Sequence, residues 1–216
     1  MVDIKIIAQT DWEQWRVKTF AAKEPETLAW IDDFKDDAVF WDIGANIGVY
    51  SLYCAHKHPK SIVYAFEPLR NNYLRLWQNI WKNEFTNISP YYVAVGNANG
   101  IRWFNAQTVD TGSSGGQLRK EAGTGMNYEI PVRSIDRMAE VMIKPDYVKI
   151  DTDGNEYDIL LGMRKTLPYI RSILIEENLF VEEIDEILKD AGFEPDEKYN
   201  SLKTRESDHN MIFTRF

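Results

Sequence analysis

The chain has 216 residues, of which 44% are hydrophobic, and its formal net charge at pH 7 is −9. This size and composition indicate one compact domain, and the negative charge argues against a nucleic-acid partner, because phosphates attract clustered Lys and Arg. Cys54 is the single cysteine, so no internal disulfide can form. The N-terminus is too short and too charged for a signal peptide, and no run approaches the roughly 20 apolar residues that span a bilayer, so we expect a soluble cytoplasmic protein.

Residues 11–34 carry aromatic and aliphatic side chains at roughly helical spacing, and Pro25 can open a new helix within them. We therefore expect two short helices in an N-terminal helical cap segment, residues 1–37, ahead of the main domain, residues 38–216. The aromatic side chains have two interpretations. They belong to the core and seal one edge of a sheet, or they roof a substrate cleft.

From Ala38 onward the pattern alternates between strands and helices. Strands are predicted at 38–42, 61–66, 88–95, 147–150 and 172–176, and helices at 48–56, 69–83, 134–142, 155–167 and 181–191. Strands separated by helices favour a parallel sheet. Gly192 is a typical helix stop, and the segments 193–200 and 210–214 that follow it can pair antiparallel at one edge of that sheet.

Residues 97–133 interrupt this alternation with a polar stretch that is dense in glycine at 111–116 and 123–125. Such a composition is typical of a mobile insertion. One interpretation is a β-hairpin with a loose connection, and the other is a loop that orders over substrate and excludes water.

The ends of the first two predicted strands carry the residues of a ligand site. The run 42–48, Asp-Ile-Gly-Ala-Asn-Ile-Gly, places a carboxylate at a strand end and glycines in the loop before a helix. The glycines let a ligand approach the backbone, and the helix directs unpaired N–H groups toward its negative groups. Glu67 ends the next strand 25 positions after Asp42, where an acid of a βαβ unit reaches ribose hydroxyls.

Two alternatives to this interpretation remain. Asp42 and Glu67 also suit acids that cap a helix or form a turn at a strand end. The same set of residues fits a nicotinamide-binding site, although the spacing in the loop departs from the Gly-x-Gly-x-x-Gly pattern of such sites, because Ala45 and Asn46 occupy its middle.

Several motifs in this chain resemble the FkbM family of S-adenosylmethionine-dependent methyltransferases. They lie, in the same order as in the family, at 42–48, 66–68, 94–96, 149–156, 175–176 and 210–213. The resemblance implies an α/β fold, a Rossmann-like three-layer sandwich of class I with a seven-stranded, mostly parallel sheet and an antiparallel C-terminal hairpin strand. It also implies an enzyme that methylates an oxygen, the expected acceptor being a hydroxyl of a sugar, a glycan or a secondary metabolite.

S-adenosylmethionine needs backbone donors, an acceptor for a diol, apolar walls and nearby negative charge. The positions within these motifs that would supply these are Asp42, Gly44, Ala45, Asn46, Gly48, Glu67, Pro68, Ala94, Val95 and Asp151, and the adjacent Ser51 and Leu69 would add further contacts. The loop would approach the amino-acid end of the cofactor, with Asp42 orienting its ammonium and Ser51 as a further contact. Glu67 would accept both ribose hydroxyls. The apolar residues among these positions would enclose the adenine ring.

Methyl transfer to a hydroxyl requires a close acceptor and a group that removes its proton. We expect this group among the acids after two later strands or at the C-terminal hairpin, and the candidates are Asp153, Glu156, Glu177 and His209. So many acids at one edge repel each other. A Mg²⁺ ion held by Asp151, Glu176 and Asn178 would relieve that repulsion, whereas the alternative is that these residues cap helices or bind backbone N–H groups.

Other functions stay open at this point. A non-catalytic sensor or partner subunit would bind S-adenosylmethionine in the same pocket, and a nicotinamide-dependent oxidoreductase or an RNA methyltransferase fits less well. The expected partner is a small-molecule or glycan acceptor, and the acidic cleft suits a neutral or cationic molecule better than a phosphorylated one.

Overall fold

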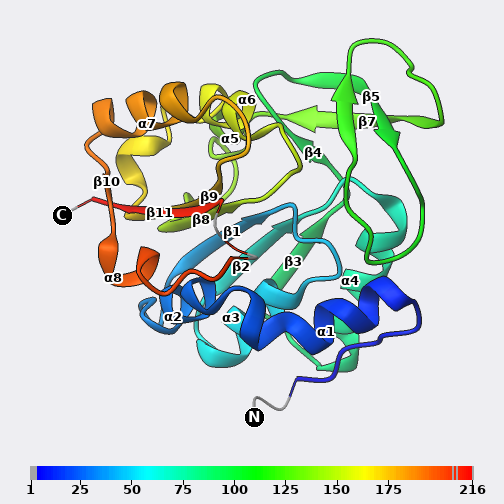
Figure 1. Cartoon of the computed structure of the whole chain (residues 1–216), viewed down its shortest axis with the longest axis horizontal. Helices are drawn as coiled ribbons and strands as arrows, with labels where there is room; N and C mark the ends of the chain where they lie inside the picture. The colour runs from blue at the N-terminus through cyan, green and yellow to red at the C-terminus, as the bar shows by residue number, and fades with distance from the viewer. Residues whose placement is uncertain (1–3, 206, 208, 216) are drawn as a thin grey trace.

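In the computed structural model, which describes residues 4–205, 207 and 209–215, a seven-stranded sheet lies between two layers of helices (Figure 1). In spatial order its strands are β10 (Glu194–Pro195), β11 (Asn210–Thr214), β9 (Ser172–Glu176), β8 (Tyr147–Ile150), β1 (Val39–Ile43), β2 (Ile62–Phe66) and β3 (Ile88–Tyr91). Neighbours from β9 to β3 are parallel, whereas β11 is antiparallel to both β9 and β10. The predicted α/β fold with its antiparallel C-terminal strand pair is confirmed.

The helices divide between the two faces of this sheet (Figure 1). One layer contains α2 (Pro25–Asp32), α3 (Val49–Lys57) and α4 (Arg70–Lys82), and the other contains α5 (Ile135–Met138), α6 (Glu156–Leu161) and α7 (Val181–Asp190). Residues of a strand alternate between these layers, so Phe40 packs with Leu52 under α3, whereas Trp41 packs with Ile159 under α6. Because both faces are covered, β1 is buried throughout.

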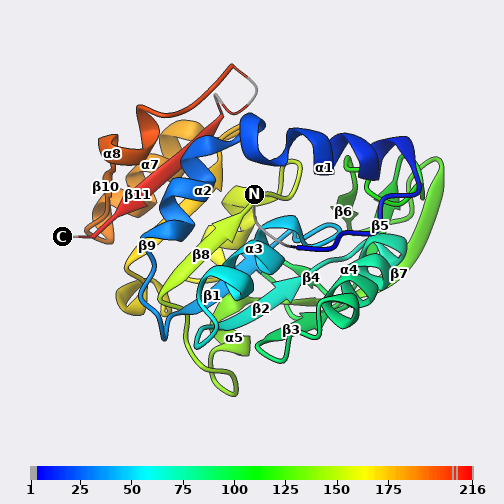
Figure 2. The same cartoon turned by 90° about the horizontal axis from the view of Figure 1, so that it is seen from below.

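The N-terminal region forms two helices, as the spacing predicted. Thr10 caps α1 (Asp11–Lys23) in a capping box with Glu13, and Pro25 opens α2. The aromatic residues of the region have different environments: Trp30 is buried and donates to Ser172 Oγ, whereas Trp12 and Trp15 are exposed. Figure 2 shows α1 extending from α2 toward the hairpin of the insertion.

The insertion contributes to a second sheet of four strands. Its order is β4 (Ala94–Val95), β7 (Met126–Arg133), β5 (Gly100–Ala106) and β6 (Gln117–Arg119). The single strand predicted at 88–95 is therefore wrong, since β3 and β4 belong to different sheets. The chain turns between them, where Val93 N donates to Tyr91 O at 3.1 Å.

Two helices are shorter than predicted. The segment 134–142 is α-helical only over α5, and the helix expected at 155–167 ends at Leu161. Gly162 packs so closely on the chain before β5 that an added Cβ would lie 2.4 Å from Gly96 O. After α7, Gly192 adopts a φ of +84° and ends the helix as expected, and α8 (Glu197–Asn200) follows β10. Within the described part of the chain, no helix has both the length and the apolar character that a membrane span needs.

Candidate functional site

A cleft lies at the carboxyl ends of β1, β2 and β8, with the second sheet and the insertion on its other side. It encloses about 730 Å³, part of which is open to solvent. Of the residues predicted to form the site, those that line the cleft are Gly44, Asn46, Glu67, Pro68, Leu69, Ala94, Val95, Asp151 and Asp153. Open α/β sheets bind their ligands at this edge.

The loop after β1 tolerates few substitutions, because its backbone conformation and its close contacts disfavour larger side chains. Gly44 has a φ of +82°, and an added Cβ would lie 1.8 Å from Asp151 O. Asn46 also has a positive φ, of 53°, and its Nδ2 donates to Ser113 O at 2.8 Å. Gly48, at the N-cap of α3, has no room for a Cβ because Leu76 Cδ1 would lie 2.3 Å away. The loop is therefore closely packed, and its Gly44 and Asn46 line the cleft.

Glu67, at the end of β2, is buried in the cleft wall. Its Oε2 accepts from Asn46 N at 2.7 Å, and its Oε1 accepts from Leu69 N at 2.7 Å. Burial raises the pKa of Glu67 to about 7, against the lowering effect of these two hydrogen bonds. This carboxyl group fixes the glycine loop to the β2 end, and it can change its charge near neutral pH.

The apolar part of the cleft belongs to a small core of its own. Leu69 and Ala94 pack there with Phe104 of β5, and Pro68 and Val95 line the same cleft. Pro68 is held by Tyr128, whose hydroxyl donates to Pro68 O at 2.8 Å. These walls suit a flat apolar ring system.

Asp42, Ala45, Gly48 and Ser51 are not in the cleft wall but directly behind it. Ser51 Oγ donates to Asp42 Oδ2 at 2.5 Å, which ties β1 to α3. The other oxygen, Oδ1, is buried and has no hydrogen-bond partner among the described residues. Burial raises the pKa of Asp42.

Lys149 neutralises part of this acidic edge. It pairs with Asp42 in the register of β8 and β1, is only 1% exposed, and its Nζ lies 2.6 Å from Asp151 Oδ2. Although burial alone would lower the pKa of Lys149, the carboxylates of Asp151, Glu24 and Asp42 raise it. The ion pair in turn lowers the pKa of Asp151 in spite of its burial.

Glu156 and Asp153, the two other acids that follow β8, have different environments. Glu156 is 1% exposed, and its Oε1 accepts from Thr152 N, Thr152 Oγ1 and Gly154 N at 2.9, 3.0 and 3.2 Å, so it holds the turn together. Asp153 lines the cleft, and its Oδ2 accepts from Gly115 N at 2.7 Å. Burial raises the pKa of Asp153, and the charge of Asp151 adds to the rise.

Glu177 and His209 do not line the cleft. Glu177 N donates to His209 O at 2.7 Å, and the His209 side chain is exposed. Burial and the neighbouring Asp185 raise the pKa of Glu177 to about 7. These candidates lie beside the β9 and β11 ends.

The expected magnesium ligands are not arranged for a metal ion. Asp151 is paired with the Lys149 ammonium, and Glu176 is hydrogen-bonded to Asn178, so both carboxyl groups have partners within the protein. Across residues 4–205, 207 and 209–215, no group of three or more His, Cys, Asp or Glu residues could hold a metal ion. The expectation of Mg²⁺ receives no support from this edge of the sheet.

The segment 108–116, called the lid below, covers one side of the cleft and is held by α4, by the N-terminal side of the chain, by the cleft loop and by the turn after β8. Asn72 of α4 accepts from Gly112 N at 2.7 Å and donates to Ser113 O at 3.0 Å. From the N-terminal side, Thr10 Oγ1 donates to Thr111 O and Arg16 Nε to Gly112 O, each at 2.6 Å. These contacts place the lid between α1, α4 and the cleft.

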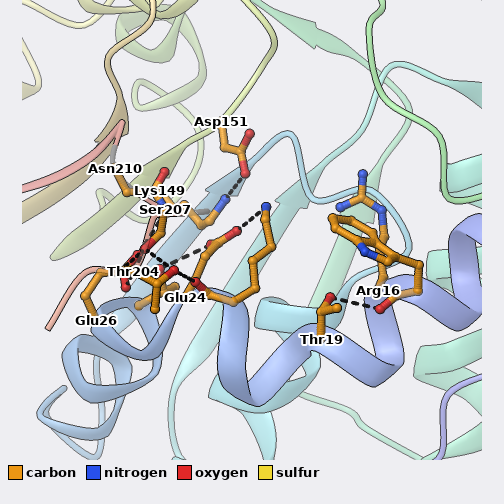
Figure 3. A network of polar contacts seen from close by, with 12 residues as sticks. Arg16, Thr19, Glu24, Glu26, Lys149, Asp151, Thr204, Ser207 and Asn210 are labelled. Atoms are coloured by element: carbon orange, nitrogen blue, oxygen red, sulfur yellow. Dashed lines mark hydrogen bonds and ion pairs between the residues drawn. The ribbon is translucent and has the colours of Figure 1, made fainter.

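A polar network under the junction of α1 and α2 supports the acidic edge (Figure 3). Glu24 pairs with Lys23 Nζ at 2.7 Å, and Glu26 accepts from Ser207 Oγ and Asn210 Nδ2, each at 3.1 Å. The network connects the N-terminal helices to the start of β11. It brings the two buried glutamates to the side of the sheet that holds Lys149.

Sequence reasoning missed several residues of the cleft, and they come from distant parts of the chain. The main ones are Arg16, Asn72, Phe104, Ser113, Ser114 and Leu118. The glycine-rich composition around 111–116 pointed to the lid, but nothing in the local pattern at Arg16 distinguished it from a solvent-exposed helical residue.

Comparison with known proteins agrees with this geometry. The model of the methyltransferase FkbM domain matches residues 42–195, more than half of the chain. Hexuronic acid methyltransferase AglP from Haloferax volcanii is 25% identical over 191 residues, which cover 87% of this chain and 76% of AglP.

Solved structures show the same fold at low sequence identity. Methyltransferase FkbM from Methylobacillus flagellatus KT has a TM-score of 0.60 and 16% identity, and the match covers 95% of this chain but 55% of that protein. The chain thus spans little more than half of that relative. Magnesium protoporphyrin IX methyltransferase from Synechocystis PCC 6803, solved with bound S-adenosylmethionine, has a TM-score of 0.56 and 12% identity, with coverages of 97% and 86%.

Proposed function

Because the chain belongs to the FkbM methyltransferase family, we propose that it binds S-adenosylmethionine in this cleft and methylates an oxygen of a sugar, glycan or secondary-metabolite acceptor. The observation that carries the proposal is the convergence of the glycine loop, Glu67 and Asp153 on one cleft at the carboxyl edge of the sheet. AglP, a hexuronic acid methyltransferase, supports a sugar as the acceptor.

The residues present fit the cofactor. Gly44 and Asn46 line the cleft where its amino-acid end would lie, and the orphaned Oδ1 of Asp42 supplies negative charge behind that loop. Glu67 is the acceptor for the ribose hydroxyls, and the apolar core around Leu69 and Phe104 suits the adenine ring. The bound cofactor supplies an electrophilic methyl group on a positively charged sulfur.

Asp153 is the residue we propose as the general base. Among the candidates from the sequence, it alone is an acid that lines the cleft without an ion-pair partner within the described residues. Its raised pKa makes it a better proton acceptor than an ordinary aspartate. Glu156 then acts through the turn that positions Asp153, and Glu177 and His209 remain secondary candidates.

The lid contributes by excluding water. Ser113 is buried in the cleft wall, and its hydroxyl has no hydrogen-bond partner among the described residues, so it is available to a bound molecule. Closure over the reactants strengthens the electrostatic interactions inside the cleft.

Ligand binding tests the proposal directly. We expect S-adenosylmethionine and S-adenosylhomocysteine, but not NAD, to raise the melting temperature by about 5–10 °C at 100-fold excess over Kd. Glu67→Ala should abolish the shift, whereas Glu194→Ala, at an exposed position of β10, should keep it. A shift with NAD alone would refute the proposal.

A turnover assay distinguishes a methyltransferase from a non-catalytic protein that only binds S-adenosylmethionine. Incubation with a labelled methyl donor and a panel of sugar acceptors should give labelled product, and Asp153→Asn should lower kcat by about 100-fold or more with unchanged S-adenosylhomocysteine affinity. Tight cofactor binding without turnover of any acceptor would favour the non-catalytic alternative.

A further inference from the structure

We propose that one face of α1, formed by Trp12, Trp15 and Arg16, is the acceptor subsite and that it binds a sugar bearing a carboxylate. The inference rests on the proposed function, because it names the acceptor class of the same cleft. It assigns the aromatic rings to the sugar face and the guanidinium to the carboxylate.

The position of Arg16 connects this face to the reacting centre. Arg16 lines the cleft together with Asp151 and Asp153, so its guanidinium lies in the same cleft as these two acids. Figure 3 shows Arg16 on α1 at the right of the view and Asp151 above the same helices, left of the centre. An acceptor bound at Arg16 therefore reaches the end of β8.

Arg16 is oriented but retains binding capacity. Its Nε donates to Gly112 O at 2.6 Å, which fixes the plane of the guanidinium against the lid. Within the described residues, no hydrogen bond or ion pair engages its two terminal nitrogens. A guanidinium held in this way can bind a carboxylate with both of these groups.

Trp12 and Trp15, on the same helix as Arg16, form an exposed aromatic surface beside it. Trp12 is 47% exposed and Trp15 is 39% exposed, and their ring centroids lie 6.4 Å apart at an interplanar angle of 86°. Arg16 Cζ lies 5.9 Å from the Trp15 ring centroid. Positions 12, 15 and 16 are separated by three and four residues, so they share one side of the helix.

The chemistry of this surface selects its occupant. Exposed indoles on a monomer point to a binding surface, and the C–H faces of sugar rings pack on such rings while their hydroxyls stay in water. The chain carries a net charge of −9, and the cleft floor contains Asp151 and Asp153, so an anionic acceptor needs a local cation. Lys23, a second cation on α1, is paired with Glu24. Arg16 lines the cleft and can therefore supply this positive charge.

The acids of the sequence motifs indicated a neutral or cationic acceptor, whereas the contacts of Lys149 and Arg16 favour an anionic one. Lys149 neutralises Asp151 from within the sheet, and Arg16 adds a positive charge at the cleft, so the site accommodates a carboxylate.

The experiment compares two oligosaccharides that differ only in the terminal residue, glucuronic acid or glucose. Tryptophan fluorescence titration of the full chain, with S-adenosylhomocysteine present, should show at least about tenfold tighter binding of the glucuronic acid form. Arg16→Gln should remove this preference while leaving binding of the glucose form within about twofold. Trp15→Ala should weaken both oligosaccharides about tenfold.

Matched variants control for folding and charge. Lys18→Gln removes a positive charge from an exposed position of the same helix, and Trp81→Ala removes a tryptophan that is 74% exposed on α4, so both should bind like the wild type. Equal binding of the two oligosaccharides to the wild type, or an unchanged preference in Arg16→Gln, would overturn the inference. Calorimetry with S-adenosylhomocysteine alone tests the proposed function separately. Failure of the chain to bind S-adenosylhomocysteine would contradict the proposed function whatever the result with the oligosaccharides.

Discussion

Gly44 and Gly100 show how two glycines with a positive φ have different steric requirements at different positions. Both have a positive φ, +82° and +144°, which side chains rarely adopt. An added Cβ at Gly44 would lie 1.8 Å from Asp151 O, whereas at Gly100 nothing lies within 4 Å. The β1 and β8 ends can approach this closely only because residue 44 lacks a side chain.

Gly44→Ala should therefore lower the free energy of unfolding by about 3 kcal/mol or more, because strain and overlap add. Gly100→Ala should cost about 1 kcal/mol, from backbone strain alone. Urea denaturation of both variants measures the difference. Equal costs would show that the contact with Asp151 relaxes freely.

Glu67 should make ligand binding in the cleft depend on pH. Its pKa of about 7 means that the carboxylate form, which accepts hydroxyl hydrogens, grows in population between pH 6 and pH 8. We expect the affinity for S-adenosylhomocysteine to rise by up to about tenfold over this range. Calorimetry on Glu67→Gln, which stays neutral, should give a weaker and flat profile; a rise that persists in this variant would assign the titration to another group.

Loss of Lys149 should destabilise the fold. Lys149→Met removes the ammonium group from Asp151, whose side chain is 33% exposed, and from the neighbourhood of the buried Asp42, which should cost about 1.5–3 kcal/mol. The double variant Lys149→Met/Asp151→Asn should recover part of this loss, because it removes the unpaired charge. Lys60→Met, at an exposed position, should stay within about 0.5 kcal/mol of the wild type in the same urea titrations.

Among the elements, the lid has few attachments and most of them are side-chain hydrogen bonds. Asn72 provides two of them, through Gly112 N and Ser113 O. Asn71 of the same helix donates to Val109 O, and the others come from Thr10, α1, the cleft loop and the turn after β8, which border the cleft. Its position is thereby coupled to the site.

Asn72→Ala should loosen the lid without unfolding the chain. Amide hydrogen exchange within 108–116 should accelerate about tenfold, since each lost hydrogen bond contributes about 1 kcal/mol. Asn87→Ala, which removes hydrogen bonds to Ala55 O and His58 O far from the lid, should leave this segment unchanged. Unchanged exchange in Asn72→Ala would show that other contacts suffice to hold the lid.

At the scale of the whole molecule, the sheet gathers acids from several strands at one edge. Glu67 and Glu177 have pKa values of about 7, and the pKa of Glu176 is also raised, because burial disfavours their charged forms. In the unfolded chain these groups titrate near 4.5. The folded chain therefore binds more protons than the unfolded chain between these values, and stability falls as pH rises through this window.

We expect urea denaturation at pH 5, 6, 7 and 8 to show this decline. The double variant Glu67→Gln/Glu177→Gln should have a shallower decline, because neither position then ionises. A wild-type stability that rises steadily from pH 5 to pH 8 would contradict the raised pKa values of these buried acids.

Much of the main sheet follows from local patterns. The predicted strands at 38–42, 61–66, 147–150 and 172–176 each fall within one residue of the observed ones, because buried strands are marked by continuous apolar runs. The glycine loop and Glu67 lie at strand ends that the same pattern locates. The pattern at 88–95 predicted one strand, but the turn before Val93 moves the chain from the main sheet to the second sheet.

The sequence by itself therefore determined the order of strands and helices, the family, and the loop and acids that face the cleft, since all of these depend on neighbouring residues. Only the tertiary structure decided that Lys149 neutralises Asp151, that Asn72 holds the lid, and that Arg16 enters the cleft. These contacts join residues according to sheet register and helix packing, which arise from the whole chain and leave no local pattern.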